Sequence, residues 1–292
     1  MTYEEKCEQA RRMRSRETYG LVTPEELAQY PARQEEFTLS TEAGPVHIYR
    51  LTPETLPAHC PMIIHFHGGG FIKGRLNKDR LFCSRMAMTY QCLVWDVDYS
   101  LAPESVFPQA VRESYLVVQY AFEHAEELGV DRKRIALVGH SAGGNLATTV
   151  CMRAGETDAF KPAALAVSFS PMDLHTDPAK KPRIEGDMPT EVARTYNAFY
   201  VDPEIARDPY ASPLFASAEQ LTKFPETLVM TCGRDGLCFE AEEFALKLAR
   251  SGVNVTLRRF VNSLHGFTLN RNGEWQEGLD LLQRFIADHL GK

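Results

Sequence analysis

The hydrophobic positions of this chain form short continuous runs, separated by longer segments of helical periodicity. Two alternating stretches, at 37–39 and 46–48, predict a pair of short strands joined by a turn through residues 43–45. Further runs are apolar without alternation, which is typical of strands buried on both faces. These runs are 62–66, 92–97, 135–138, 164–169, 227–230 and 253–260. Helical patterns lie between most of them, near residues 79–90, 108–128, 144–154, 236–251 and 274–290.

Strands that alternate with helices predict an α/β protein with a mostly parallel, eight-stranded sheet flanked by helices. We expect one large catalytic domain, built from residues 35–172 and 216–292. Two segments interrupt the pattern. Residues 1–34 are polar and helical, with a short helix opening at Pro24, and residues 173–215 are rich in proline with a helix near 190–200. We expect both to form a cap over one end of the sheet, because long insertions in compact domains are usually functional.

Composition excludes several classes of function. The chain is 44% hydrophobic and 24% charged with a net charge of −7, which is typical of a globular protein and argues against a nucleic-acid partner. The one basic run, residues 11–16, has acidic neighbours and predicts a solvated amphipathic helix. No signal-peptide core and no apolar stretch of membrane-spanning length is present, so a cytoplasmic protein without a membrane partner is expected.

The seven cysteines are odd in number, scattered and without a C-x-x-C pair. Several fall in apolar segments, where a thiol behaves as a small hydrophobic side chain. We therefore expect reduced structural thiols, with no disulfide framework and no metal site.

The strongest chemical signal is a serine between glycines directly after a buried strand. Residues 134–138 run into Gly139-His140-Ser141-Ala142-Gly143-Gly144, and a helical pattern follows. A strand that turns at once into a helix leaves no room for side chains beside the turn. Gly139 and Gly143 supply that room, so Ser141 is predicted to lie on a strained nucleophile elbow with its hydroxyl accessible. Gly144 is expected to be a further supporting residue.

A serine hydroxyl needs a base to take its proton and an acid to orient that base. Asp235 follows the strand at 227–230 and His265 follows the strand at 253–260. The carboxyl ends of parallel strands share one edge of the sheet, where sites in α/β folds gather. The sequence therefore predicts a catalytic triad of Ser141, Asp235 and His265.

Other histidines and acids compete weakly for these roles. His47, His59, His124, His175 and His289 lack a strand-end context and are expected at the surface. His65 lies inside a strand, so we expect it to be a hydrogen-bonded core residue. His140 adjoins Ser141, but adjacent side chains on a sharp turn point apart, so we do not expect it to be the base. Asp173 is the main rival acid, and we expect it to shape the site or brace the cap.

A second motif, His67-Gly68-Gly69-Gly70-Phe71, follows an early strand. Attack on an ester places negative charge on the carbonyl oxygen, which fixed N–H donors must stabilise. Consecutive glycines let the backbone approach closely. Gly68 and Gly69 are the predicted donors of an oxyanion hole, with the N–H of Ala142 as the third.

Four motifs together resemble the hormone-sensitive-lipase-like (family IV) carboxylesterases of the α/β-hydrolase superfamily: the glycine motif at 67–71, residues 98–104, residues 141–145 and His265-Gly266-Phe267. The resemblance implies an α/β-hydrolase fold, ester hydrolysis without a cofactor, an N-terminal cap and often dimers, so a homodimer is an open expectation. It also implies that His67 braces the oxyanion loop and that Tyr99 and Glu104 are supporting residues. The chain departs from the family at His140, where an acid is common, and at Gly236, where proline often follows the catalytic Asp.

These observations predict a serine carboxylesterase that hydrolyses small-molecule, short-chain acetyl-like esters through an acyl-enzyme. Charged residues in the cap segments favour small soluble esters over an oil–water interface: Glu25, Glu26, Arg33, Lys180, Lys181, Arg183 and Glu185. An amidase or formamidase, or a sugar-ester deacetylase, would use the same triad. A thioesterase or acyltransferase, a peptidase and a non-catalytic small-molecule receptor remain alternatives.

Overall fold

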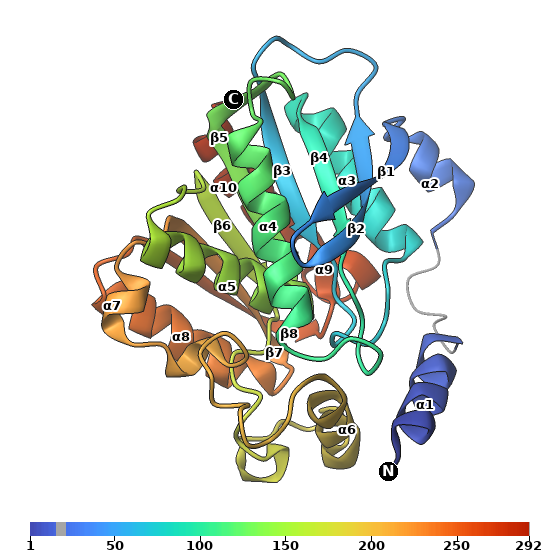
Figure 1. The fold of residues 1–292 in the computed structure, drawn as a ribbon, viewed down its shortest axis with the longest axis vertical. Coiled ribbons are helices and arrows are strands. Elements are labelled where there is room, and N and C mark those ends of the chain that lie inside the picture. The colour runs from blue at the N-terminus through green and yellow to red at the C-terminus, as the bar shows by residue number, and fades with distance from the viewer. Residues whose placement is uncertain (16–21, 292) are drawn as a thin grey trace.

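The computed structural model describes residues 1–15 and 22–291, whose strands form one eight-stranded sheet (Figure 1). The strands are β1 (Arg33–Thr41), β2 (Gly44–Thr52), β3 (Cys60–Phe66), β4 (Leu93–Asp98), β5 (Val130–His140), β6 (Ala164–Ser168), β7 (Glu226–Arg234) and β8 (Val255–Leu264). Their order is β1-β2-β4-β3-β5-β6-β7-β8. Strand β2 pairs antiparallel with β1 and β4, and every pair from β4 to β8 is parallel. The predicted α/β fold with a mostly parallel sheet is confirmed.

The helices connect the strands much as the sequence pattern predicts. They are α1 (Tyr3–Ser15), α2 (Pro24–Ala28), α3 (Asn77–Tyr90), α4 (Gln109–Glu123), α5 (Ala142–Thr157), α6 (Thr190–Tyr200), α7 (Ala218–Leu221), α8 (Leu237–Arg250), α9 (Phe267–Asn270) and α10 (Trp275–Leu290). Helix α4 ends five residues earlier than expected. A turn follows it, closed by a hydrogen bond from the Val130 N–H to the Ala125 carbonyl, and leads directly into β5.

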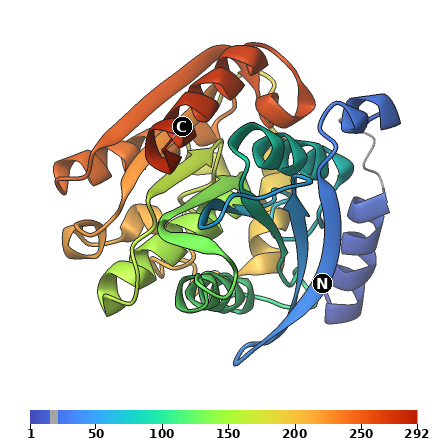
Figure 2. The same cartoon turned by 90° about the horizontal axis from the view of Figure 1, so that it is seen from above.

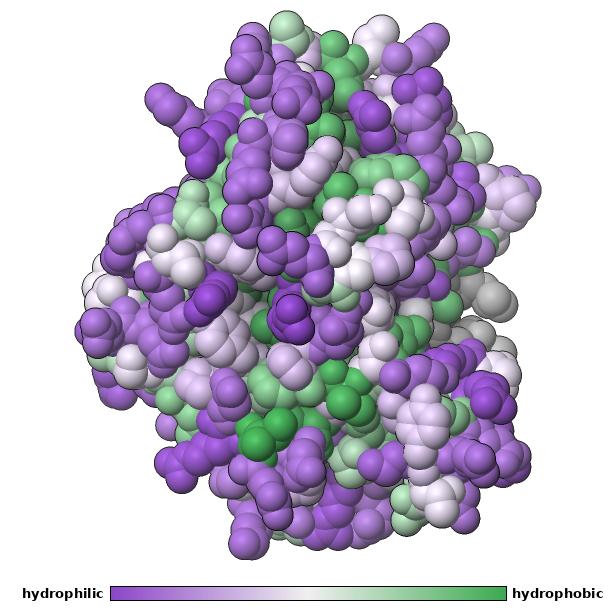
Figure 3. Space-filling view, viewed as in Figure 1, coloured by the Kyte–Doolittle hydropathy of each residue, from purple (hydrophilic) through white to green (hydrophobic). Residues whose placement is uncertain are grey.

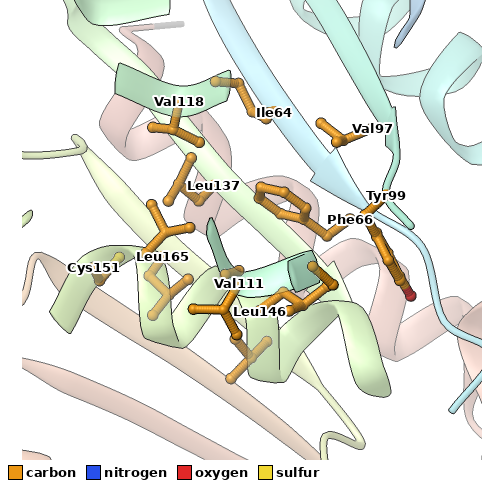
Figure 4. Packing of buried hydrophobic residues seen from close by; sticks show 14 of the residues in the cluster. Ile64, Phe66, Val97, Tyr99, Val111, Val118, Leu137, Leu146, Cys151 and Leu165 are labelled. Carbon is orange, nitrogen blue, oxygen red and sulfur yellow. The ribbon is translucent and has the colours of Figure 1, made fainter. Parts of the chain in front are cut away.

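Helices cover both faces of the central strands, which explains the continuous apolarity of β3, β4, β6 and β7. The prediction that the run at 253–260 is buried on both faces is wrong, because β8 is the edge strand and most of its residues are exposed. Helices α3 and α10 lie on one side and α4 and α5 on the other (Figure 2). Along β3 the side chains alternate between the two cores. Ile64 and Phe66 pack with Leu137 and Leu146 on the α4–α5 side (Figure 4), whereas Ile63 belongs to the opposite cluster. Burying one such side chain contributes about 1.5–3 kcal/mol.

The N-terminal segment and the 173–215 insertion meet at one end of the molecule. Helices α1 and α6 both lie at the lower end of Figure 1, and the Lys6 ammonium donates a hydrogen bond to the Ala198 carbonyl at 3.0 Å. The insertion leaves the sheet after β6 and returns before β7. Strand β1 begins at Arg33, so the last two residues of the predicted 1–34 segment belong to the sheet.

The prediction that the basic run is a purely solvated helix is wrong for one of its arginines. Arg14 makes a two-bond ion pair with Glu104, at 2.8 and 2.7 Å, and also donates to the carbonyls of Ile72 and Ala102. Arg12, by contrast, pairs along its own helix with Glu8, as expected on a solvated face. The sixth residue of the run, Arg16, lies outside the described residues.

Within the described part of the chain, no helix has the length and apolarity needed to cross a membrane. All seven cysteines are buried, and none of them forms a disulfide.

Candidate active site

Ser141 lies at the junction of β5 and α5, in a backbone conformation that side chains rarely adopt. Its φ is 53° and its ψ is −122°. Strand β5 ends at His140 and helix α5 begins at Ala142, so one residue makes the whole turn. The Ser141 N–H donates to the Ser168 carbonyl of β6 at 2.9 Å, which ties the turn to the neighbouring strand. Such strained positions are typical of functional sites.

Close packing around Ser141 leaves no room for side chains at the neighbouring glycine positions. A Cβ on Gly139 would strike the backbone of Gly143, and a Cβ on Gly143 would strike the carbonyls of Phe66 and His67 at the end of β3. A Cβ on Gly144 would overlap the Ser170 hydroxyl. Helix α5 therefore starts in direct contact with the strands on either side.

The structure brings Ser141, His265 and Asp235 together at one edge of the sheet. His265 follows β8 and its Nε2 lies 3.1 Å from the Ser141 Oγ. Asp235 follows β7 and its Oδ2 lies 2.6 Å from His265 Nδ1. The Asp235 side chain is 11% exposed, whereas 42% of the His265 side chain is exposed. The carboxylate is thus largely shielded from water, while the imidazole is open to the cavity.

Phe169 also packs against this group, a contact the sequence analysis did not anticipate. Its ring lies edge-on to His265, with ring centroids 5.0 Å apart, and it lines the same cavity. An apolar ring beside an imidazole restricts the orientations that the imidazole can adopt.

The glycine motif forms a tight loop against the elbow. Gly68 lies so close that an added Cβ would be 3.3 Å from the Ser141 Cβ. Gly69 has a φ of 131° and its carbonyl accepts the N–H groups of Ile72 and Lys73. The backbone N–H groups of Gly68, Gly69 and Ala142 have no hydrogen-bond acceptor among the residues that the structure describes. They remain available to an oxygen bound beside Ser141.

His67 and Tyr99 support this loop from beneath. Their rings stack at 4.3 Å, and the Tyr99 hydroxyl donates to the His67 carbonyl at 2.8 Å. His67 Nδ1 donates to the Gly68 carbonyl at 2.7 Å, and both side chains are buried. Burial opposes protonation of His67, but the nearby carboxylates of Asp98 and Asp79 help to raise its pKa above the ordinary value.

Glu104 does not line the cavity; it holds helix α1 through Arg14. The hydrogen bond from Arg14 lowers the pKa of Glu104, so the pair is ionised. Arg14 also holds the carbonyl of Ile72, two residues beyond Gly70. The glycine loop is therefore connected to the N-terminal helix.

His140 and His65 belong to a buried chain of hydrogen bonds on the other side of the elbow. His140 Nδ1 lies 2.9 Å from His65 Nε2, and His65 Nδ1 lies 2.7 Å from Asp96. Burial, followed by the charge of His65, holds the pKa of His140 well below its ordinary value. Its ring nitrogen bonds to His65 and not to Ser141.

The atoms of His65, Cys83 and Asp96 lie within 4.8 Å of one another, a spacing that a metal ion could bridge. The donor set does not suit one. Both His65 nitrogens are hydrogen bonded, the Arg75 guanidinium binds Asp96, and burial raises the pKa of the Cys83 thiol. A cation would compete with Arg75 for the same carboxylate.

The rival acid Asp173 lies at the cavity, but the carboxylate that bonds to His265 is that of Asp235. Its Oδ1 accepts the backbone N–H groups of His175 and Thr176, at 2.9 and 2.8 Å. It closes the turn at the start of the 173–215 insertion.

The cavity over Ser141 has a volume of about 520 Å³ and lies between the sheet edge and the 173–215 insertion. The insertion makes three contacts that the sequence pattern did not indicate. Tyr196 packs so closely on Gly70 that a Cβ there would strike its ring. The Lys181 ammonium pairs with Glu240 of α8 at 2.6 Å, and Asp187 accepts the N–H of Gly236 at 2.6 Å. Each contact joins residues that are far apart in the chain, so no local sequence pattern predicts it.

A serine on a strand-to-helix turn, with histidine and aspartate after the last two strands of this sheet, defines an α/β hydrolase. A family model described as the alpha/beta hydrolase fold matches residues 63–269. The chain belongs to this family, within its hormone-sensitive-lipase-like branch of carboxylic ester hydrolases.

Similarity to named esterases and lipases supports this placement. The chain is 30% identical to ethyl acetate hydrolase from Pseudomonas putida over 87% of its own length and 82% of that protein. It is 36% identical to mouse hormone-sensitive lipase over 40% of its length, which is 15% of the lipase. Its structure resembles that of the thermophilic carboxylesterase EstE1 from a metagenomic library, with a TM-score of 0.81, 28% identity and coverage of 99% and 97%.

Proposed function

We propose that this chain is a serine carboxylesterase that cleaves short-chain acyl esters through an acyl-enzyme. One observation carries the proposal: His265 lies within hydrogen-bond distance of both the Ser141 hydroxyl and the buried Asp235 carboxylate. Because the carboxylate accepts the proton on Nδ1, the lone pair of Nε2 is directed at the hydroxyl, as a general base requires.

In the first step, Ser141 Oγ attacks the ester carbonyl carbon while its proton passes to His265 Nε2. Asp235 stabilises the imidazolium that forms. The carbonyl oxygen becomes an oxyanion and receives the N–H groups of Gly68, Gly69 and Ala142. Ala142 also begins α5, whose N-terminal dipole favours negative charge.

The tetrahedral intermediate then collapses. The bond to the alcohol oxygen breaks, the alcohol takes the proton from His265, and the acyl group stays on Ser141. Water enters next and gives its proton to His265 as it attacks the acyl carbon. The acid leaves, and Ser141 regains its proton.

The preference for short acyl chains is supported by the size of the cavity and by the charged residues at its cover. The cavity has a volume of about 520 Å³, and the insertion contributes Lys181, Arg183 and Asp187 to a lining that is otherwise mostly apolar. The surface viewed in Figure 3 is mostly hydrophilic, with hydrophobic residues in smaller groups between, unlike the broad apolar face that an oil–water interface requires. The similarity to ethyl acetate hydrolase points in the same direction.

Replacing the nucleophile tests the reaction. Ser141→Ala should lower turnover of p-nitrophenyl acetate by on the order of 10⁴. A phosphonate ester should add one equivalent to the wild-type protein, with the label on Ser141, and none to the variant. A receptor on the same scaffold would bind a ligand and fail to react. Retention of esterase activity in Ser141→Ala within about tenfold of wild type would contradict the proposal.

A series of p-nitrophenyl esters tests the acyl preference. Activity should be highest for acyl groups of about two to four carbons and fall as the chain outgrows the cavity. A maximum at ten carbons or more would overturn the short-chain assignment. A matched ester and anilide of the same acid separate an esterase from an amidase, because an amidase would cleave both at comparable rates.

Seven buried cysteines without a disulfide support a reducing compartment such as the cytoplasm. Fractionation of the source cells tests this. The homodimer expected from the family is tested by light scattering of the purified protein.

A further inference from the structure

The carboxylate of Asp187 connects the 173–215 insertion to the loop that holds Asp235. One oxygen accepts the N–H of Gly236 at 2.6 Å, and the other accepts the N–H of Ile184 at 2.7 Å. Only 9% of the Asp187 side chain is exposed. A buried carboxylate that accepts two short hydrogen bonds is held firmly, because each bond to a charged acceptor is stronger than a neutral one.

The N–H of Gly236 belongs to the peptide unit that joins Asp235 to Gly236. Asp187 therefore binds the backbone directly adjoining the triad acid. The Asp235 carboxylate is otherwise held by one long hydrogen bond, from the Leu237 N–H at 3.2 Å, and by His265 at 2.6 Å. A shift of the peptide unit after Asp235 would displace the following backbone, and with it the Leu237 N–H that helps to orient this carboxylate.

Space, and not backbone conformation, explains why residue 236 is glycine. Its φ is −60°, a value open to any residue and close to the one that proline fixes. A Cβ at this position would lie 2.6 Å from one Asp187 oxygen and 3.1 Å from its Cγ. Any larger residue would displace the carboxylate, and a proline would also lack the N–H that the carboxylate binds.

We propose that Asp187 is a positioning residue for the triad acid, and that Gly236 is retained because it leaves room for this carboxylate. The inference rests on the proposed role of Asp235. Through this contact the insertion fixes the orientation of Asp235, in addition to lining the cavity.

Single substitutions should lower kcat more than they change KM. A hydrogen bond to a charged group is worth about 1.5–3 kcal/mol, so Asp187→Ala should lower kcat by about tenfold to a hundredfold. KM for p-nitrophenyl acetate should stay within about threefold of wild type. Gly236→Pro should cause a similar loss, because it removes the donor and collides with the acceptor. In both variants the proton resonance shared by His265 and Asp235 should shift.

The double variant Asp187→Ala/Gly236→Pro gives the decisive result. Alanine at 187 makes room for the proline ring, and proline removes the N–H that Asp187→Ala leaves unpaired. The double variant should therefore recover at least about tenfold of the kcat lost in either single variant. Asp177→Ala is the matched control, since Asp177 also caps a turn of the insertion, through Ala179, but bonds to Arg194 and not to residues 235–237.

Two outcomes would overturn the inference. Additive losses in the double variant would mean that Asp187 and Gly236 act independently. A raised KM with unchanged kcat in Asp187→Ala would make Asp187 a substrate contact. Failure of the proposed function is separate: it would appear as full activity in Ser141→Ala or Asp235→Ala, whatever the result at position 187.

Discussion

Replacing Gly69 by alanine should separate the oxyanion loop's contribution to catalysis from its contribution to stability. Gly69 has a φ of 131°, and its added Cβ would strike the Lys73 carbonyl in the turn that Gly69 itself closes. The conformation alone costs about 1–3 kcal/mol of folding free energy. The collision must in addition move the backbone of residues 69–73. A displaced oxyanion donor costs about 3 kcal/mol of barrier, or roughly a hundredfold in kcat/KM.

Gly44→Ala is the matched control. Gly44 also has a positive φ, at 115°, but nothing lies within 4 Å of its added Cβ, and it is the first residue of β2, directly after the turn from β1. Denaturant unfolding should show a loss of about 1–3 kcal/mol in both variants. Hydrolysis of p-nitrophenyl acetate should fall about a hundredfold in Gly69→Ala and less than about twofold in Gly44→Ala. If Gly69→Ala is destabilised yet keeps kcat/KM within about threefold of wild type, this turn does not position the donors.

Three further predictions concern stability and burial. Burial raises the pKa of Asp96, but His65 and Arg75 outweigh it and hold that pKa below its ordinary value, so its stabilising effect is complete above about pH 4 and lost as pH falls further. The Tm of Asp96→Asn should accordingly fall less than the Tm of wild type between about pH 4 and pH 2, and an equal fall in both proteins would contradict this. Arg14→Met should lower the free energy of unfolding in denaturant by about 1–2 kcal/mol, whereas Arg11→Met, at an exposed position, should hardly change it. Equal losses in the two variants would mean that the Glu104 contact is not stabilising. A thiol reagent should label the seven cysteines only after unfolding, since all are buried and burial raises the pKa of Cys238 to about 11; rapid labelling of the native protein would show that a thiol is accessible.

Much of the sheet and of the site follows from local pattern. Ser141, Asp235 and His265 each come directly after a strand, and parallel strands bring their carboxyl ends to one edge. Strand ends were harder to predict. Strand β8 continues to Leu264, past the expected end at residue 260, because Leu264 pairs with Arg234 of β7 beyond a bulge. The residues added there are mostly exposed, so their hydropathy does not indicate a strand.

The contacts that the sequence did not reveal depend on packing between distant segments. Asp187 and Gly236 are 49 residues apart, Lys181 and Glu240 are 59 apart, and Arg14 and Glu104 are 90 apart. A charged residue in a proline-rich or helical segment resembles any solvated residue until its partner is located. Gly236 carried a partial signal, because a glycine at a helix start with no turn motif indicates a close approach by another group.

The path of the chain through the sheet allows this enzyme to vary in sequence and length within one segment. The 173–215 insertion departs after β6 and rejoins before β7, so its length and composition can vary while every strand keeps its neighbours. New selectivity can therefore arise by exchange of this one segment between homologues. Such a graft will work best when it carries a carboxylate opposite Gly236, or when it arrives together with the proline that makes that carboxylate unnecessary.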